Sequence, residues 1–348
     1  MKRLLPIALC ALLCVVPACA RKQETRAAKE AAPRLTRVTL NVNPTISYAP
    51  LMIAKEEGFF AAEGIDAELV SLDSNGALAA LVAGKIDVLS TGVRAGVFNM
   101  ILAGRPIQVV ADKGHSSAKC SGEAFVAPAA MAQRIAGRGL RGERIAIVRG
   151  GIAEYVTERL LDSRKVTVAD VVAIPMPQGT HVSSRQQIEA VRYIGEPTLS
   201  VLLAEGATKL VATGQELAPG HQVSLLVYGK KLLRDDPELG RRFMRAYLRG
   251  VRQFNAGKTQ RNMDIVGRFT KLPPETTRGA CWVVIANDGR IDPAAVQPFL
   301  DWALAKQYLD GPIEPARWWN PAFVDAVRSV DAVRGVDAVR GVDGILAQ

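Results

Sequence analysis

The sequence has 348 residues, a formal net charge of +10 at pH 7, and aromatic residues at 5% of its length. This length allows two lobes that each bury a core. No nucleic-acid-binding motif accompanies the basic charge, and aromatic side chains for base stacking are scarce, so we expect no nucleic-acid partner. The positive charge suits an anionic ligand or a membrane surface, and it equally suits the composition of an Arg-rich genome.

The chain begins like an exported lipoprotein. Lys2 and Arg3 precede an apolar run over residues 4–16, which has the length of a signal-peptide core and is too short to span a bilayer comfortably. "VPAC" follows, with small residues before Cys19 as in a bacterial lipobox. We expect removal of residues 1–18 and a diacylglycerol on the Cys19 thiol. The alternative is an ordinary secretory signal, with Cys19 incidental.

The next segment has the composition of a linker. Residues 19–36 are rich in Ala, Lys, Arg and Glu, which predicts a flexible tether between a lipid anchor and a folded domain. No later run is long and apolar enough to form a transmembrane helix. We therefore expect a protein of the periplasm or extracytoplasmic face, anchored to the membrane by acylated Cys19.

The cysteines and histidines form no recognisable metal site. Three of the five cysteines belong to the signal region, which leaves Cys120 and Cys281, and no CxxC, paired Cys/His or HExxH spacing occurs. We expect no metal and no cofactor. An oxidising compartment permits a disulfide, but the separation of the two cysteines leaves their geometry undetermined, and we expect them to remain unpaired.

Short units of strand and helix follow one another over residues 37–114, separated by glycines. Strands are expected over 37–43, 65–72, 86–90 and 106–114, and helices over 50–57, 77–83 and 94–103. Gly58 is placed to end the first helix in the left-handed conformation, and Ser74 or Asn75 is expected to cap the second. The order predicts an α/β fold, a parallel sheet covered by helices on both faces.

A second series of units begins near residue 144. Strands are expected over 144–148, 171–175 and 208–214, and a helix from about Ile152. The last third is mainly helical: Asp236-Pro237 opens a helix to about Phe254, and Asp292-Pro293 starts another. Residues 326–348 repeat a hexamer with valine at every third position, which gives a helix no stable buried face, so we expect an appended tail.

Three segments carry a family resemblance: "APLMIAKEEGFFAAEGIDAELV", "ALAALVAGKIDVLSTG" and "LAGRPIQVVADKG". Together they resemble periplasmic substrate-binding proteins of ABC importers for alkanesulfonates, taurine, nitrate and thiamine-pyrimidine precursors. Similarity continues through nearly all of residues 37–325. One departure is "HVSSRQQIEAVRYIGEP", where relatives usually have a second Ala-Leu-x-x-Gly-x-Ile-Asp-like helix end.

The resemblance implies a two-lobed, type II periplasmic binding-protein fold that closes on its ligand. Each lobe is a mainly parallel sheet flanked by helices. Lobe one is expected over 37–123 plus 226–325, and lobe two over 124–225.

The function implied is that of a membrane-anchored, monomeric solute-binding component without enzymatic activity. Its partners are a small-molecule ligand and an ABC permease in the inner membrane. Two alternatives stay open: an enzyme of pyrimidine-precursor synthesis on the same fold, and a sensory or scaffold lipoprotein. The enzyme alternative needs a cysteine-rich motif, or a histidine and a lysine placed at a cofactor. This sequence contains no cysteine cluster, and its export signal argues against the enzyme.

Candidate ligand contacts follow from strand ends. Ligands of open α/β sheets bind at the carboxyl ends of strands, where helix N-termini offer free N–H groups. Four loops qualify, and the resemblance adds a position in the "GEP" segment; together they give Ser47, Tyr48, Ser74, Asn75, Thr91, Gly92, Gly150, Gly151, Ile152 and Glu196. Each has a structural alternative, such as a helix cap, a tight turn or, for Glu196, a hinge salt bridge. Lys113 and His115 are expected to be solvated loop residues.

Overall fold

The computed structural model describes residues 35–177 and 188–328. The predictions about the signal peptide, Cys19, the tether before residue 35 and the tail beyond residue 328 lie outside the described residues. Within the two described ranges, no helix has both the length and the apolar character needed to cross a membrane.

The first sheet has five strands in the order β2-β1-β3-β10-β4. Its strands are β1 (Thr36–Asn41), β2 (Ile65–Val70), β3 (Val88–Gly92), β4 (Gln108–His115) and β10 (Gln222–Tyr228). β1 is parallel to β2 and β3, whereas β10 lies between β3 and β4 and is antiparallel to both. The four strands predicted for residues 37–114 are confirmed, with ends displaced by at most two residues. β10 returns from much later in the chain, which local sequence patterns do not reveal.

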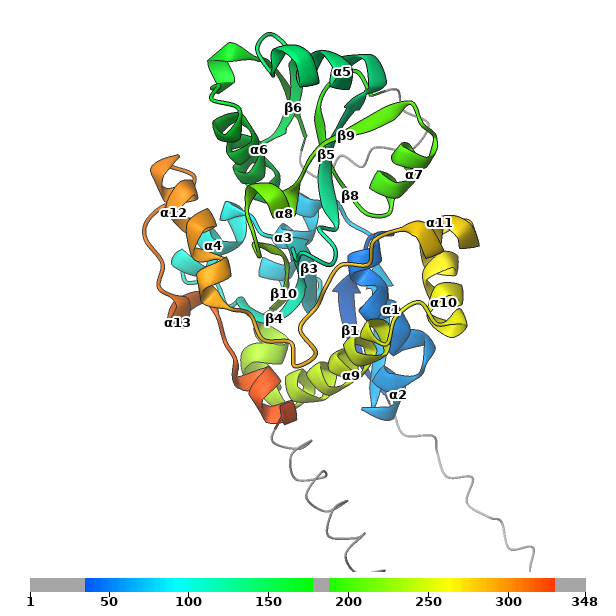
Figure 1. Ribbon diagram of the computed structural model, residues 1–348. Coiled ribbons are helices and arrows are strands. Elements are labelled where there is room, and N and C mark those ends of the chain that lie inside the picture. Colours follow the sequence, from blue (N-terminus) through cyan, green and yellow to red (C-terminus); the bar gives the residue numbers. More distant parts are fainter. Residues whose placement is uncertain (1–34, 178–187, 329–348) are drawn as a thin grey trace, which may run out of the picture. The chain divides into compact units, whose positions relative to one another are not determined.

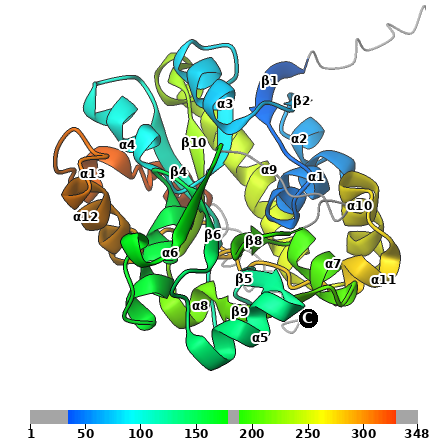
Figure 2. The same ribbon diagram turned by 90° about the horizontal axis from the view of Figure 1, so that it is seen from above.

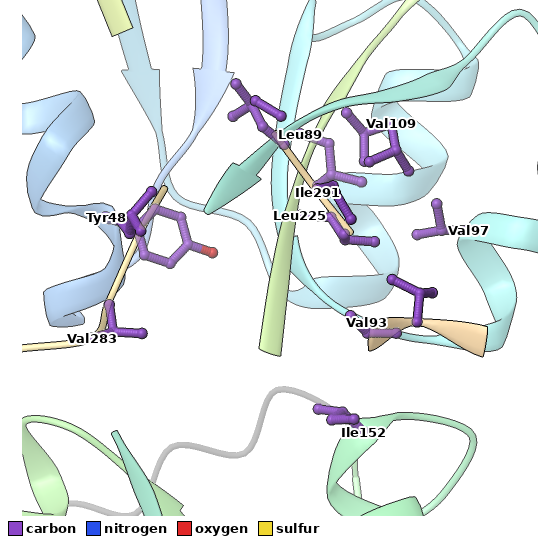
Figure 3. Close-up of a cluster of buried hydrophobic side chains, with 14 of the residues drawn as sticks. Tyr48, Leu89, Val93, Val97, Val109, Ile152, Leu225, Val283 and Ile291 are labelled. Atoms are coloured by element: carbon purple, nitrogen blue, oxygen red, sulfur yellow. The ribbon is translucent and has the colours of Figure 1, made fainter. Parts of the chain in front are cut away.

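Helices cover both faces of this sheet (Figures 1 and 2). The first helical elements are η1 (Ile46–Tyr48), α1 (Ala49–Glu56), α2 (Phe59–Ala62), α3 (Ser74–Val82) and α4 (Ala95–Leu102). The later ones are η3 (Lys231–Asp235), α9 (Pro237–Asn255), α10 (Gln260–Thr270), α11 (Pro274–Gly279), η4 (Pro293–Ala295), α12 (Gln297–Ala305) and α13 (Pro315–Trp318). Buried side chains of neighbouring strands, among them Leu89, Val109 and Leu225, form the core under them (Figure 3).

Two local features explain the break after the first helix. Gly58 has φ +71°, the left-handed conformation predicted for the end of α1. The chain then turns so that Phe60, 2% exposed, packs on Phe243 of α9 with ring centroids 4.8 Å apart. α9 can approach α1 closely because Gly250 has no side chain. A Cβ at this position would lie 2.2 Å from the Pro50 carbonyl oxygen.

Helix capping follows the predictions at one site and departs at another. Asp236 caps α9 as predicted, accepting a hydrogen bond from Leu239 N at 2.8 Å. The cap of α3 is Asp73, which accepts from Asn75 N and Gly76 N at 3.0 Å each, so the expectation of Ser74 or Asn75 was wrong by one residue or more. A carboxylate at this position satisfies two free helix N–H groups, and it also complements the positive end of the helix dipole.

The remaining strands form a second group. β5 (Glu123–Pro128) lies between β8 (Arg192–Gly195) and β9 (Thr208–Thr213) and is antiparallel to both. β6 (Arg144–Val148) pairs in parallel with β7 (Val172–Met176), and an Ile145–Val191 bridge joins β6 to the segment before β8. The helical elements here are α5 (Ala129–Arg138), α6 (Ile152–Ser163), η2 (Val168–Asp170), α7 (Thr198–Ala204) and α8 (Gly214–Leu217). The predicted α/β architecture is confirmed, but β5 pairs antiparallel on both sides, where a mainly parallel sheet was expected for this lobe.

One prediction about the cysteines is wrong. Cys120 and Cys281 form a disulfide, with α-carbons 5.7 Å apart. Backbone pairing between His115 and Val284 brings the segment after β4 next to the segment after α11, and this pairing places the two cysteines within bonding range. Such a contact depends on the tertiary fold, which the spacing of two cysteines does not encode.

Candidate functional site

A cavity of about 290 Å³ lies between the first sheet and the second group of strands. Residues at the ends of β1, β3 and β4 line one side, and residues of β5, β8 and α6 line the other. β3 and β4 are both antiparallel to β10, so they are parallel to each other and to β1, and their carboxyl ends meet at one edge of the sheet. The cavity therefore occupies the position where open α/β sheets bind ligands.

Most of the predicted contact residues come together here. Seven of the ten line the cavity: Ser47, Tyr48, Ser74, Thr91, Gly92, Ile152 and Glu196. Asn75, Gly150 and Gly151 are not among its lining residues. Asn75 lies on α3 and accepts a hydrogen bond from Arg94 Nη1 at 3.4 Å.

The backbone groups of the Gly150–Ile152 turn form hydrogen bonds with other residues of the protein. Ala95 N donates to Gly150 O at 3.0 Å, and Ile152 N donates to Val93 O at 2.9 Å. Gly150 N donates to the Glu154 carboxylate at 2.6 Å. The N-terminal end of α6 is thus hydrogen-bonded to the loop between β3 and α4. Of this turn, only Ile152 lines the cavity.

Tyr48 forms a buried wall of the cavity. It is the last residue of η1, 6% exposed, and its hydroxyl donates to Ser90 O at 2.9 Å. Burial raises the pKa of Tyr48 to about 12, so the phenol is neutral at physiological pH. The side chain is held by packing and by its hydrogen bond, which gives the cavity a fixed aromatic surface.

Lys113 lies at the same wall, although the sequence suggested a solvated residue. It is 2% exposed, and its Nζ lies 3.7 Å from the centroid of the Tyr48 ring and 3.0 Å from Ser47 Oγ. In the pairing of β4 with β10, Asp112 and Gly114 face consecutive partners, Leu225 and Ser224, so Lys113 is the extra residue of a β-bulge. Bulges redirect a side chain, and this one belongs to the strand ends that line the cavity.

Glu123, at the start of β5, is the centre of a buried hydrogen-bonded cluster. Tyr193 donates its hydroxyl to Glu123 Oε2, and His221 Nε2 lies 3.4 Å from the same oxygen. Burial raises the pKa of Tyr193 well above its usual range, and the negative charge of Glu123 adds to this shift. Burial alone would lower the pKa of His221, but the hydrogen bond and the attraction of Glu123 outweigh it and raise the pKa.

Glu196, the residue taken from the family resemblance, lines the cavity but is also bonded to its own surroundings. Its carboxylate accepts from Ser200 N at 3.1 Å, Ser200 Oγ at 2.8 Å and Cys281 N at 3.0 Å. Burial raises the pKa of this carboxyl, and the three donors oppose that rise. Glu196 thereby connects the start of α7 to the disulfide-bonded segment.

Local sequence patterns did not indicate that the cavity would also be lined by Lys113, Glu123, Tyr193, Ser90 and Ser224. The position of Lys113 could have been inferred from the sequence. It lies at the carboxyl end of the strand expected over 106–114, and ligands of open α/β sheets bind at the carboxyl ends of strands. Glu123 and Tyr193 lie on strands that local patterns did not predict. Among the described residues, no group of three His, Cys, Asp or Glu side chains is placed to hold a metal ion.

Known structures share this fold at low sequence identity. The ligand-binding component of an ABC-type import system from Staphylococcus aureus, solved with zinc bound, is 18% identical with a TM-score of 0.69, covering 83% of this chain and 98% of that chain. The nitrate-binding protein NrtA from Synechocystis is 18% identical with a TM-score of 0.65, covering 85% and 86%. The alkanesulfonate-binding protein SsuA from Xanthomonas axonopodis, bound to MOPS, is 18% identical with a TM-score of 0.63, covering 84% and 99%.

An enzyme also shares the fold. A cysteine-to-serine mutant of the desulfinase DszB, in complex with biphenyl-2-sulfinic acid, is 15% identical with a TM-score of 0.57, covering 84% of this chain and 99% of that chain. No curated protein matches the sequence significantly. The model of the NMT1-like family matches residues 31–267, which is more than half of the sequence. The chain therefore belongs to the NMT1-like family and has the fold of periplasmic binding proteins.

Proposed function

We propose that this protein is the solute-binding component of an ABC importer. It captures a small organic anion or heterocycle (a sulfonate, a nitrate-like ion, or a pyrimidine or vitamin precursor) between lobe one, 37–123 plus 226–325, and lobe two, 124–225. The observation that carries this proposal is the cavity at the carboxyl ends of β1, β3 and β4, whose opposite wall comes from the second group of strands. The sulfonate- and nitrate-binding structures with this fold support it.

The candidate contacts are the strand-end residues that line the cavity: Ser47, Tyr48, Ser74, Thr91, Gly92, Ile152 and Glu196. Hydroxyl groups dominate this set, and they bond oxygen or nitrogen atoms of a ligand without bringing a charge that must lose its water. A volume of about 290 Å³ is at the lower limit of pockets for drug-sized molecules, so the ligand is small.

The arrangement of nucleophilic and basic groups favours binding over catalysis. The Cys120 and Cys281 sulfurs are joined in a disulfide, so neither offers a thiolate. The His221 imidazole lies 3.4 Å from the Glu123 carboxylate, and His221 is not among the residues that line the cavity. For these reasons we propose transport as the role of the cavity, ahead of pyrimidine-precursor synthesis.

A thermal-shift screen with the exported protein tests the proposal. Sulfonates, nitrate, carboxylates, pyrimidines and flavins are added one at a time, and a ligand present at a hundred times its dissociation constant adds roughly 2.7 kcal/mol to the free energy of unfolding. A hit should then stimulate the ATPase of the matching permease in a reconstituted membrane. A hit without any effect on transport would favour the sensory or scaffold role.

We further propose that the protein acts as a monomer at the membrane, anchored through acylated Cys19. Radiolabelled fatty acid should enter the wild-type chain during growth of a bacterial host, and the Cys19→Ala variant should take up none. Label in that variant, or a mature N-terminus elsewhere than Cys19, would contradict the anchor.

A further inference from the structure

Lys113 is a buried amino group at the cavity, and no carboxylate of the described residues forms an ion pair with it. The side chain is 2% exposed, and no described carboxylate oxygen lies within 4.0 Å of its Nζ. Its partners are the Ser47 hydroxyl at 3.0 Å and the face of the Tyr48 ring at 3.7 Å. Burying an ammonium group without a counter-ion is unfavourable, and such groups are usually paired or functional.

The adjacent carboxylate is already committed to other donors. Asp112 accepts from Gly114 N at 2.7 Å, Gln222 Nε2 at 2.7 Å and Ala286 N at 2.8 Å, and its second oxygen lies 2.9 Å from His115 Nδ1. These contacts connect β4 to Gln222 of β10 and to the segment around Ala286. Asp112 therefore acts on Lys113 only through space.

The two carboxylates across the cavity are occupied as well. Glu123 is bonded to Tyr193 and lies against His221, and Glu196 accepts from Ser200 and Cys281. Each has structural donors that it would lose by turning toward Lys113. The oxygens of both carboxylates are therefore held by protein donors, whereas the Lys113 amino group contacts one hydroxyl and one aromatic ring.

Two unpartnered hydroxyls lie at the same wall. Ser90 on β3 is 1% exposed and Ser224 on β10 is 3% exposed, and both line the cavity. Neither hydroxyl has a hydrogen-bond partner within residues 35–177 and 188–328. In the β3–β10 pairing Ser90 faces Leu226, two residues along from Ser224, so both side chains project from the same face of the sheet. A buried hydroxyl without a hydrogen-bond partner is unfavourable, and a ligand oxygen within hydrogen-bonding distance would remove that cost.

We propose that the ligand carries an acidic group, a carboxylate or a sulfonate, that forms an ion pair with Lys113 and accepts hydrogen bonds from the hydroxyls of Ser47, Ser90 and Ser224. The inference rests on the proposed binding function and narrows it: an uncharged heterocycle would leave the ammonium without a counter-ion. It assigns Lys113 as the residue that selects the charge of the ligand.

The ionisation of Lys113 is consistent with this assignment. Burial lowers the pKa of Lys113 to about 7, against the opposing influence of Asp112 on its own strand and of Glu123 on β5. The other neighbouring groups, Tyr48 and Ser47 on η1, are neutral. A negative charge from the ligand would favour the protonated form and raise this pKa.

Matched pairs of probes test the inference by calorimetry on the full exported protein. The pairs are butanesulfonate with butanesulfonamide, butanoate with butanamide, and benzoate with benzamide. We expect at least one acid to bind at least tenfold more tightly than its amide. In Lys113→Met the affinity for that acid should fall at least tenfold, while the affinity for the amide should change less than twofold.

Lys209→Met is the matched control, because Lys209 is an exposed lysine on β9, and it should bind like wild type. Ser224→Ala removes one proposed hydrogen-bond donor and leaves the charge of Lys113 in place, so the affinity for the acid should fall threefold or more. This variant tests the inference if Lys113→Met fails to fold. Amides that bind as tightly as their acids, or an acid that binds Lys113→Met like wild type, would overturn the inference. Binding of uncharged heterocycles alone would leave the transport proposal standing and refute the acidic ligand, whereas no binding by any probe or heterocycle would contradict both.

Discussion

Replacing Lys113 by methionine should change how the stability of the ligand-free protein depends on pH. Lysine in an unfolded chain has a pKa of 10.5, and burial lowers that of Lys113 to about 7. Between these two values the unfolded chain holds a proton that the folded protein has released. The unfolding free energy of the wild type therefore rises with pH across this window, and it falls as the pH drops toward 7.

The size of the effect follows from the same two pKa values. At 1.36 kcal/mol per pKa unit, the burial of Lys113 destabilises the folded state by about 4 kcal/mol at pH 7 and by about 1 kcal/mol at pH 9.5. Methionine has a similar length and no charge, so Lys113→Met should lack this dependence while keeping the packing on Tyr48. The loss of the hydrogen bond to Ser47 costs about 1 kcal/mol at every pH and does not alter the slope.

Melting curves at pH 7 and pH 9.5 measure the difference. The melting temperature of the wild type relative to Lys113→Met should rise by roughly 5 °C between the two pH values, since a domain of about 300 residues shifts by roughly 1.6 °C per kcal/mol. The contributions of groups that titrate elsewhere are the same in both proteins and cancel in this comparison. The melting temperature of Lys209→Met should therefore change with pH as that of the wild type does. If Lys113→Met also runs parallel, Lys113 keeps its ordinary pKa, and the reasoning that its burial lacks a compensating charge fails.

Three further predictions concern the scaffold. Thiol titration of a chain of residues 20–348 under denaturing, non-reducing conditions should find no free thiol, and two titratable thiols would contradict the bond. Removal of the disulfide by Cys281→Ser should lower the unfolding free energy by about 2–5 kcal/mol. Gly250→Ala should destabilise by about 1–3 kcal/mol because the new methyl group would overlap the Pro50 carbonyl, whereas Gly279→Ala, where a Cβ meets no atom within 4 Å, should be close to neutral by chemical denaturation. Asp73→Ala should lower the melting temperature more than Asn75→Ala, because Asp73 accepts from two backbone N–H groups of α3; equal melting temperatures would refute its role as the cap.

The sequence contained enough information for the architecture but less for the site. Alternating strand and helix units with glycine stops predicted β1 to β4 closely, because hydrophobic period and backbone freedom are local properties. The turn at Gly150–Ile152 was recognised as a strand-to-helix connection. That its backbone bonds to Val93 and Ala95 depends on how two distant segments meet, which no local pattern encodes.

Lys113 shows most clearly why part of the site could not be predicted. A charged residue near a glycine at the end of a strand is typical of an exposed loop, so the local pattern favoured solvent. The side chain is buried because β10, more than a hundred residues later, pairs with β4 and forces a bulge at this residue. The same distant strand brings Ser224 to the cavity. Pairing between segments far apart in the sequence thus decides which strand-end residues face the ligand.

The disulfide also has a topological consequence. It joins residues 161 positions apart, so the chain between Cys120 and Cys281 is a covalently closed ring that contains every strand from β5 to β10. A protease that cuts once anywhere within this ring opens it without releasing a fragment, and the nicked protein migrates as one species until a reductant is added. A single cut outside the ring, between β1 and β4 or after α11, separates two pieces at once under denaturing conditions. Cleavage patterns with and without reductant therefore assign each accessible site to the inside or the outside of the ring.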